Sequence, residues 1–264
     1  MAHPKQTIAL TIAGSDSGGG AGIQADLKTF ARFGVFGTSA ITAVTAQNTI
    51  GVRAWERVSP ALVRAQIDAV ADDLRPAAIK SGMLGDADVV FAVRDGIRAH
   101  GLAPYVLDPV MVATSGDLLL EADAVAAIVS ELIPLATLVT PNLDEAALLV
   151  DEPVRDVATM ERAARAIVER YGAAAALVKG GHLEGDTLVD VLFDGTTVRR
   201  FTHERIDTRS THGSGCTLSA AIAALLATGE SLDDAVAQGL DYVHRAIRSA
   251  PGLGAGHGPL NHFA

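Results

Sequence analysis

The sequence predicts an α/β fold in which helices cover both faces of a mostly parallel sheet. Short apolar runs with many β-branched residues alternate with longer segments of helical period. The connections between them are rich in Gly, Pro, Asn and Asp, as is usual where a chain turns. The sequence contains no internal repeat, low-complexity tract or linker, so we expect residues 1–264 to form one domain.

The first predicted strand covers residues 7–13, and the helix that follows it covers residues 22–33. Later apolar runs predict further buried strands at residues 39–46, 78–81, 105–108, 138–140 and 175–179. One segment breaks this rhythm, because Asp194 and Gly195 separate two apolar runs within residues 188–201. That pattern predicts a tight antiparallel hairpin at the edge of the sheet.

Several helix boundaries carry their own signals. Ser59 before Pro60 predicts a helix start with a capping hydroxyl and proline at the first helical position. Gly101, Gly172 and Gly229 each follow a helical segment and predict its end. Ligands of such folds bind beyond the carboxyl ends of the strands, so we expect the functional residues there.

The composition excludes several classes of function. A net charge of −10 without any run of Lys or Arg argues against binding to nucleic acid or to anionic membranes. Residues 1–7 resemble neither a signal peptide nor a membrane span, so we expect a cytoplasmic protein. Cys216 is the single cysteine, which excludes an internal disulfide and a cysteine metal cage. The eight histidines show no zinc-binding spacing.

A first glycine-rich loop, residues 14–22, joins the first strand to its helix and reads Gly-Ser-Asp-Ser-Gly-Gly-Gly-Ala-Gly. Small residues there would let the backbone close around a ligand, although a purely structural turn is the alternative. Gly20, Gly22 and Ala25 match a dinucleotide fingerprint, but no acid follows between Asp26 and Glu56 to bind a ribose. No glycine precedes a lysine, so a P-loop is also excluded.

A second glycine turn, Thr211-His-Gly-Ser-Gly-Cys216, precedes a strongly apolar helix. Backbone N–H groups of Gly213, Ser214, Gly215 and Cys216 can converge at the positive end of that helix and bind an oxyanion. Such fixed donors suit phosphoryl transfer, in which negative charge develops on the moving group. The same field should lower the pKa of Cys216 and favour a thiolate, although a small packed side chain is the alternative. We expect the side chain of His212 to face solvent.

The segment Ser210-Thr-His-Gly-Ser-Gly-Cys-Thr-Leu-Ser-Ala-Ala221 resembles the signature of hydroxymethylpyrimidine/phosphomethylpyrimidine kinases of thiamine synthesis, which belong to the ribokinase-like superfamily. The likeness spans nearly the whole chain. It includes residues 10–17 and 19–30, Thr45-Ala-Gln-Asn-Thr49, Lys80-Ser-Gly-Met-Leu84, Leu107-Asp-Pro-Val-Met111, Thr140-Pro-Asn-Leu-Asp-Glu145, Val178-Lys-Gly-Gly-His182 and Gly256-His-Gly-Pro-Leu-Asn-His-Phe263. The resemblance implies a three-layer α/β/α sandwich that uses ATP and Mg²⁺, often as a homodimer.

The resemblance also implies the roles of the catalytic side. Cys216 stands where most ribokinase-like enzymes have an aspartate that acts as general base. Asp108 ends a strand and Glu145 begins a helix, where carboxylates can organise magnesium. Asn142 three residues before Glu145 is equally typical of a capping box. Lys179 and Thr211 are expected to bind the nucleotide, with a solvated strand-end lysine as the alternative for Lys179.

The predicted substrate side consists of Gln47, Asp26, Gly14 and Met83. The amide of Gln47 offers one acceptor and two donors, which complement an aminopyrimidine edge. Met83 could wall a flat ring or be ordinary core, and Asp26 could orient a polar ring edge or only decorate the first helical turn. A pyridoxal kinase and a silent pyrimidine-binding regulator are the rival functions, and Gln47 favours the pyrimidine.

Overall fold

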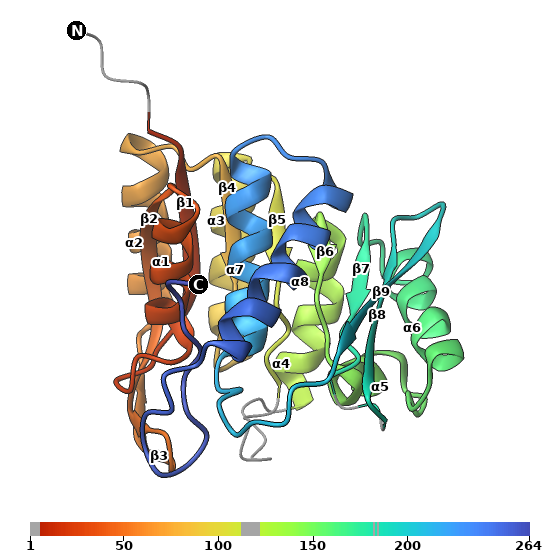
Figure 1. Cartoon of the computed structure of the whole chain (residues 1–264). Coiled ribbons are helices and arrows are strands. Elements are labelled where there is room, and N and C mark those ends of the chain that lie inside the picture. The colour runs from red at the N-terminus through yellow and green to blue at the C-terminus, as the bar shows by residue number, and fades with distance from the viewer. Residues whose placement is uncertain (1–5, 112–121, 182, 184) are drawn as a thin grey trace, which may run out of the picture.

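The computed structural model describes residues 6–111, 122–181, 183 and 185–264, and in these residues nine strands form one sheet in the order β3-β2-β1-β4-β5-β6-β7-β8-β9 (Figure 1). The strands are β1 Ile8–Ser15, β2 Phe36–Asn48, β3 Gly51–Arg57, β4 Ala78–Ser81, β5 Tyr105–Leu107, β6 Leu138–Val139, β7 Ala176–Val178, β8 Thr187–Phe193 and β9 Val198–Glu204. The neighbouring strands β2, β1, β4, β5, β6 and β7, named in their order across the sheet, are parallel to one another. The expected mostly parallel sheet is therefore confirmed.

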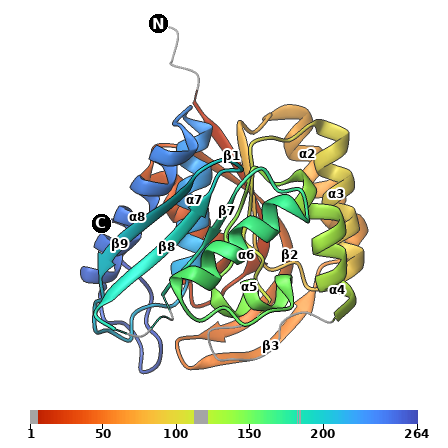
Figure 2. The ribbon, with the colours of Figure 1, turned by 90° about the vertical axis from the view of Figure 1, so that its right-hand side faces the viewer.

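The described helices cover both faces of this sheet, with α1, α7 and α8 on one face and α2 to α6 on the other (Figure 2). They are α1 Gly22–Arg32, α2 Pro60–Asp73, α3 Ala87–His100, α4 Ala122–Ala127, α5 Leu143–Val150, α6 Val157–Glu169, α7 Ser214–Ala227 and α8 Leu232–Arg248. A π turn at Ile128–Leu132 and a 3₁₀ turn at Ile133–Leu135 continue α4. The three-layer α/β/α arrangement is thus confirmed.

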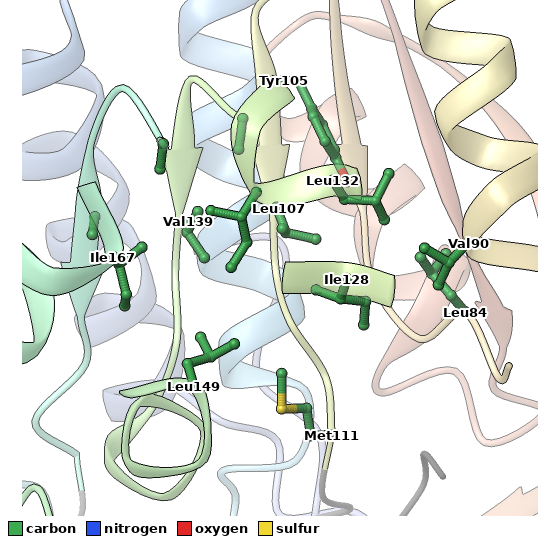
Figure 3. Packing of buried hydrophobic residues seen from close by; sticks show 14 of the residues in the cluster. Leu84, Val90, Tyr105, Leu107, Met111, Ile128, Leu132, Val139, Leu149 and Ile167 are labelled. Carbon is green, nitrogen blue, oxygen red and sulfur yellow. The ribbon is translucent and has the colours of Figure 1, made fainter. Parts of the chain in front are cut away.

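A separate apolar core lies on each face of the sheet. Figure 3 shows part of the core against α2 to α6, with Leu107 from β5 and Val139 from β6 near Ile128 and Leu132. The opposite core contains α7, every residue of which from Thr217 to Leu225 is buried. An α-helix that is apolar all round needs neighbours on all sides, and α7 packs against α1, α8 and the central strands. This central position fixes where the turn before α7 can lie.

The helix boundaries predicted from the sequence agree closely with those in the structure. The Ser59 hydroxyl accepts from Leu62 N at 3.3 Å with Pro60 at the first helical position, and Gly101 ends α3 in the left-handed conformation. The hairpin predicted within residues 188–201 is present as β8 and β9. A second antiparallel pair, β2 with β3, was not predicted. Most of β3 is exposed, so the strand carries no apolar alternation that sequence inspection could detect.

Among the described residues, none of the helices combines the length and the apolar character that crossing a bilayer requires.

Candidate active site

The predicted functional residues meet at the carboxyl ends of the parallel strands, the lower end of the sheet in Figure 1. Asp108 directly follows β5, Lys179 follows β7, and residues 16–21 of the first glycine loop follow β1. The second glycine turn reaches the same end because α7 begins there and runs back along the sheet. This arrangement brings residues as far apart in the chain as Asp16 and His212, 196 positions, into one site.

The two glycine loops touch each other. Gly213 has φ +81°, and a Cβ there would lie 1.9 Å from the carbonyl oxygen of Gly20. Only glycine permits both this conformation and this approach. Ser214 N donates to Thr211 O at 3.2 Å, so the amides of Gly215 and Cys216 are the donors that the first turn of α7 directs outward. The turn therefore has the shape expected of an anion-binding nest.

Lys179 and Asp108 form an ion pair beside this turn, with Nζ 3.0 Å from Oδ1. The Asp108 carboxylate also accepts from Thr140 Oγ1 and Ser219 Oγ, each at 3.4 Å. Lys179 is only 14% exposed, so the alternative of a solvated lysine is wrong. Burial opposes its charge, but the Asp108 and Glu145 carboxylates outweigh burial and raise the pKa of Lys179. A Cβ on Gly215 would meet Nζ at 3.0 Å, which places the ammonium directly against the nest.

Glu145 completes the charged group. Its carboxylate accepts from Asn142 N at 2.8 Å, and Asn142 Oδ1 accepts from Glu145 N at 2.9 Å, so the capping box is confirmed. Burial, reinforced by Asp108 and opposed by Lys179, raises the pKa of Glu145 from 4.5 to about 7. A buried carboxyl that is reluctant to ionise beside another carboxylate is a position where a bound cation would favour ionisation.

The donor set fits magnesium but not an all-protein metal cage. The described part of the chain contains no group of three or more His, Cys, Asp or Glu residues that could hold a metal ion. Magnesium is usually bound by one or two carboxylates together with water and substrate phosphates. Asp108 and Glu145 supply two carboxylates at the strand ends, so the residues present match that mode of binding.

Cys216 is partly buried, and the backbone amide of Gly22 at the start of α1 acts to lower the pKa of its thiol. The expected lowering of its pKa is wrong. Burial raises the pKa of Cys216 to about 11; Asp26 and Asp108 add to the effect, and the Lys80 ammonium opposes it. The helix end does not compensate for the loss of hydration and for the two neighbouring carboxylates. At neutral pH the side chain is therefore a thiol.

The substrate-side residues lie around the first glycine loop. A Cβ on Gly14 would lie 3.5 Å from Met83 Sδ, so these two positions are adjacent. Gln47 is partly buried, and its Nε2 lies 3.3 Å from His212 Nε2. His212 Nε2 lies 2.9 Å from Asp16 Oδ2, and the side chain is only 13% exposed, so the expectation that it faces solvent is wrong. His212 instead links the second glycine turn to the first loop.

Asp16 organises the first loop and was not singled out from the sequence. Its carboxylate accepts from the backbone N–H groups of Gly18, Gly20 and Ala21 at 2.7, 3.0 and 2.8 Å. Burial alone would raise the pKa of Asp16, but the His212 hydrogen bond and these amides outweigh it and lower the pKa. An aspartate inside a glycine run is a typical site for such side-chain-to-backbone bonds, and that signal was available.

Asp26 lies beneath the site rather than at its surface. The residue is fully buried, and its carboxylate accepts from Thr11 Oγ1 at 2.6 Å and from Lys80 Nζ at 2.8 and 3.0 Å. The reading of Asp26 as decoration of the first helical turn is therefore wrong. Lys80 is its partner and was given no role from the sequence, although a lysine within a wholly buried strand is an unusual feature.

Comparison with known proteins identifies the family. The phosphomethylpyrimidine kinase family model matches residues 16–261. The chain belongs to that family. A hydroxymethylpyrimidine/phosphomethylpyrimidine kinase of Rhizobium meliloti is 57% identical over 97% of both chains. Among solved structures, phosphomethylpyrimidine kinase from Clostridium difficile has a TM-score of 0.82 and 39% identity, covering 92% of this chain and all of that one.

A solved ADP complex of Bacillus subtilis pyridoxal kinase has a TM-score of 0.91 and 38% identity, covering 97% of each chain. The fold of this phosphomethylpyrimidine kinase family member is therefore ribokinase-like, and the expected superfamily is confirmed. His182, part of one of the family motifs, lies outside the described residues.

Proposed function

We propose that this protein uses ATP to phosphorylate the hydroxymethyl group of 4-amino-5-hydroxymethyl-2-methylpyrimidine, and then the resulting monophosphate, in thiamine biosynthesis. Relatives named for both activities, 57% identical in one case, support this proposal. The observation that carries it is the turn at Gly213, whose outward amides at Gly215 and Cys216 lie beside the Lys179–Asp108 ion pair. Fixed donors beside a buried ammonium suit a moving phosphoryl group.

Each residue of the charged side has a role in this proposal. The amides of Gly215 and Cys216 stabilise the equatorial oxygens of the transferred group, and Lys179 binds the phosphates of ATP, helped by Thr211. Asp108 and Glu145 would hold Mg²⁺ through oxygen ligands and water. Bound magnesium supplies neutralisation of charge on the phosphates. The chain's own contribution is to hold donors, ammonium and carboxylates in fixed positions.

Cys216 is the proposed acceptor of the hydroxymethyl proton. With a pKa raised to about 11, it is almost entirely a thiol at neutral pH, and a thiol already carries its proton, so only the small thiolate fraction can accept the hydroxymethyl proton. Phosphoryl transfer of this kind passes through a loose transition state that needs little early proton removal, so positioning and electrostatics carry most of the rate. We test the role with Cys216→Ser and Cys216→Ala in single-turnover transfer. Unchanged rates in both variants would exclude proton abstraction by this residue.

Recognition of the substrate falls to Gln47, Gly14 and Met83 in this proposal. The amide of Gln47 would pair with the amino group and ring nitrogen of the pyrimidine. Met83 would cover one face of the ring, where Gly14 leaves room for it. Asp26 acts from beneath this surface, because it is fully buried.

Product analysis by phosphorus NMR tests the reaction sequence. The purified protein is mixed with ATP, Mg²⁺ and the hydroxymethylpyrimidine, and phosphorus resonances are followed with time. We expect a monophosphate first and a diphosphate later. A reaction that stops at the monophosphate would remove the second step from the proposal, and failure to consume ATP despite pyrimidine binding would instead indicate a silent regulator.

Pyridoxal kinase is a second candidate because the Bacillus subtilis pyridoxal kinase shares the fold at a TM-score of 0.91 and 38% identity. Parallel turnover of pyridoxal and the hydroxymethylpyrimidine under identical conditions separates the two. We expect kcat/KM to favour the pyrimidine, and a clear preference for pyridoxal would reverse the assignment. The family resemblance also leads us to propose that the protein is cytoplasmic and forms a homodimer. Its sedimentation in solution would test the dimer.

A further inference from the structure

The Lys80–Asp26 ion pair is a buried charged feature that the roles proposed above do not explain. Both side chains have no exposed surface. Lys80 Nζ lies 3.0 Å from Asp26 Oδ1 and 2.8 Å from Oδ2, so the ammonium is held by both oxygens. Thr11 Oγ1 donates to Oδ2 at 2.6 Å and orients the carboxylate further. The three residues come from β4, α1 and β1, so the pair ties three elements together.

The pair lies on the interior side of the two glycine loops. A Cβ on Gly82 would lie 3.0 Å from Lys80 Nζ, so the ammonium sits against the backbone that follows β4. The turn before α7 packs against the start of α1, since a Cβ on Gly213 would lie 3.1 Å from Ala21 Cα, and Asp26 follows Gly22 by one turn of α1. The i, i+4 spacing puts both positions on one side of α1. The pair and Cys216 therefore share the same wall of the site.

The strand that carries Lys80, β4, packs against α7, the helix that the second glycine turn begins. Cys216 interacts electrostatically with four charged groups: Lys80 of β4, Asp26 of α1, Asp108 after β5, and Lys179 after β7. The Lys80 ammonium acts to lower the pKa of Cys216 and so opposes the effect of burial. The Asp26 and Asp108 carboxylates act to raise that pKa. Inside a protein such fixed charges act strongly because little water screens them.

Stability alone does not account for such a pair. Removing two charges from water costs several kcal/mol per ion, and well-packed apolar residues of similar volume are often as good or better. The four residues of β4 are all buried, so an apolar side chain at position 80 would fit the strand pattern. The pair therefore points to a role in the site above it.

We propose that Lys80 is a positioning residue for phosphoryl transfer: its ammonium, fixed by Asp26, supplies a constant positive charge beneath the Gly213–Cys216 turn. The negative transferred group then meets positive charge from below, from Lys80, as well as from Lys179 at its side. This inference rests on the proposed function, since it assigns Lys80 to the same transfer site. It predicts that the charge, and not only the packing, is required.

The test compares three variants and a control. Lys80→Met removes the ammonium, Asp26→Asn keeps it and removes the carboxylate charge, and the double variant Asp26→Leu/Lys80→Met replaces the pair by apolar side chains. Arg94→Met/Glu131→Leu removes a partly buried ion pair between α3 and the turn at residues 128–132, away from the site. Each is measured by urea unfolding, by steady-state kinetics, and by the pH profile of Cys216 alkylation with iodoacetamide.

We expect the double variant to unfold at the wild-type urea concentration or above, with kcat at least tenfold lower and both KM values within about threefold. Alkylation should require a higher pH in Lys80→Met and a lower pH in Asp26→Asn, because the two charges act on the thiol in opposite directions. The control pair should leave kcat and alkylation at wild-type values.

Wild-type kcat in the double variant would show that the pair only packs, and would overturn the proposal. A rise in KM for the pyrimidine with unchanged kcat would also overturn it, since that result indicates substrate binding by Asp26. Alkylation profiles that do not shift in opposite directions would show that the charge of Lys80 does not reach the turn. The alkylation measurement needs no substrate, so it stands even if the wild-type protein does not phosphorylate the pyrimidine.

Discussion

Replacing Gly215 by alanine should separate stability from activity. Gly215 lies in the first turn of α7, where alanine is the better helix former by up to about 1 kcal/mol. The new Cβ would lie 3.0 Å from Lys179 Nζ and 3.6 Å from Asp108 Oδ2. The carboxylate distance is an ordinary contact, but the ammonium must move by a few tenths of an ångström. It can do so because a lysine side chain is flexible.

The movement displaces Lys179 from its 3.0 Å bond to Asp108 and from the nest. A hydrogen bond to a charged group contributes about 1.5–3 kcal/mol. If that interaction is lost in the transition state, the rate should fall roughly 10- to 150-fold. We therefore expect Gly215→Ala to melt at or slightly above the wild-type temperature and to transfer phosphate at least tenfold more slowly.

The assay combines thermal unfolding with single-turnover transfer from ATP. Gly239→Ala is the matched control, because a Cβ there meets Ile222 Cγ1 at the same 3.0 Å but on α8, away from the strand ends. It should leave the transfer rate unchanged. In a double-mutant cycle, Gly215→Ala and Lys179→Met should be less than additive. A stable Gly215→Ala variant with the wild-type rate, or full additivity, would refute the reasoning.

Three further predictions concern stability. Gly213→Ala imposes a side chain at φ +81° and 1.9 Å from Gly20 O, so unfolding free energy in urea should fall by at least about 2 kcal/mol, and a wild-type midpoint would count against the turn geometry. Burial lowers the pKa of His262 from 6.5 to about 4; between these values only the unfolded chain binds the proton. Wild-type stability should therefore fall by roughly 3 kcal/mol as pH drops through this window, and His262→Gln, which can keep the bond to Thr217, should lose this slope. Glu145 has the opposite sign: with its pKa raised from 4.5 to about 7, the folded protein keeps a proton that the unfolded chain releases, so wild-type stability should decline as pH rises from 4.5 to 7. Glu145→Gln should remove that decline, and parallel pH profiles for wild type and variant would contradict it.

Local signals in the sequence were reliable because a few neighbouring residues decide them. Ser59, Gly101 and the Asn142–Glu145 capping box act within one helical turn, and each is present in the structure. The alternation of apolar strands with helices predicted the parallel sheet, because burial on both faces imposes that pattern. The glycines at residues 213 and 215 likewise predicted a tight turn before a helix, and that turn is present; its binding of an oxyanion stays a prediction.

Tertiary structure alone decided which charges meet. Lys80 pairs with Asp26 across 54 positions of the chain, and His212 pairs with Asp16 across 196. The periodic patterns of helices and strands relate only residues that are close in the sequence, so they could not predict these pairs. The same packing removed water from Cys216 and raised its pKa, although its place at a helix start had suggested the opposite. The sequence determined the fold class, the glycine turn and the types of residue at the site. Folding determined their partners and their hydration, because both depend on neighbours that only the packed sheet and helices bring together.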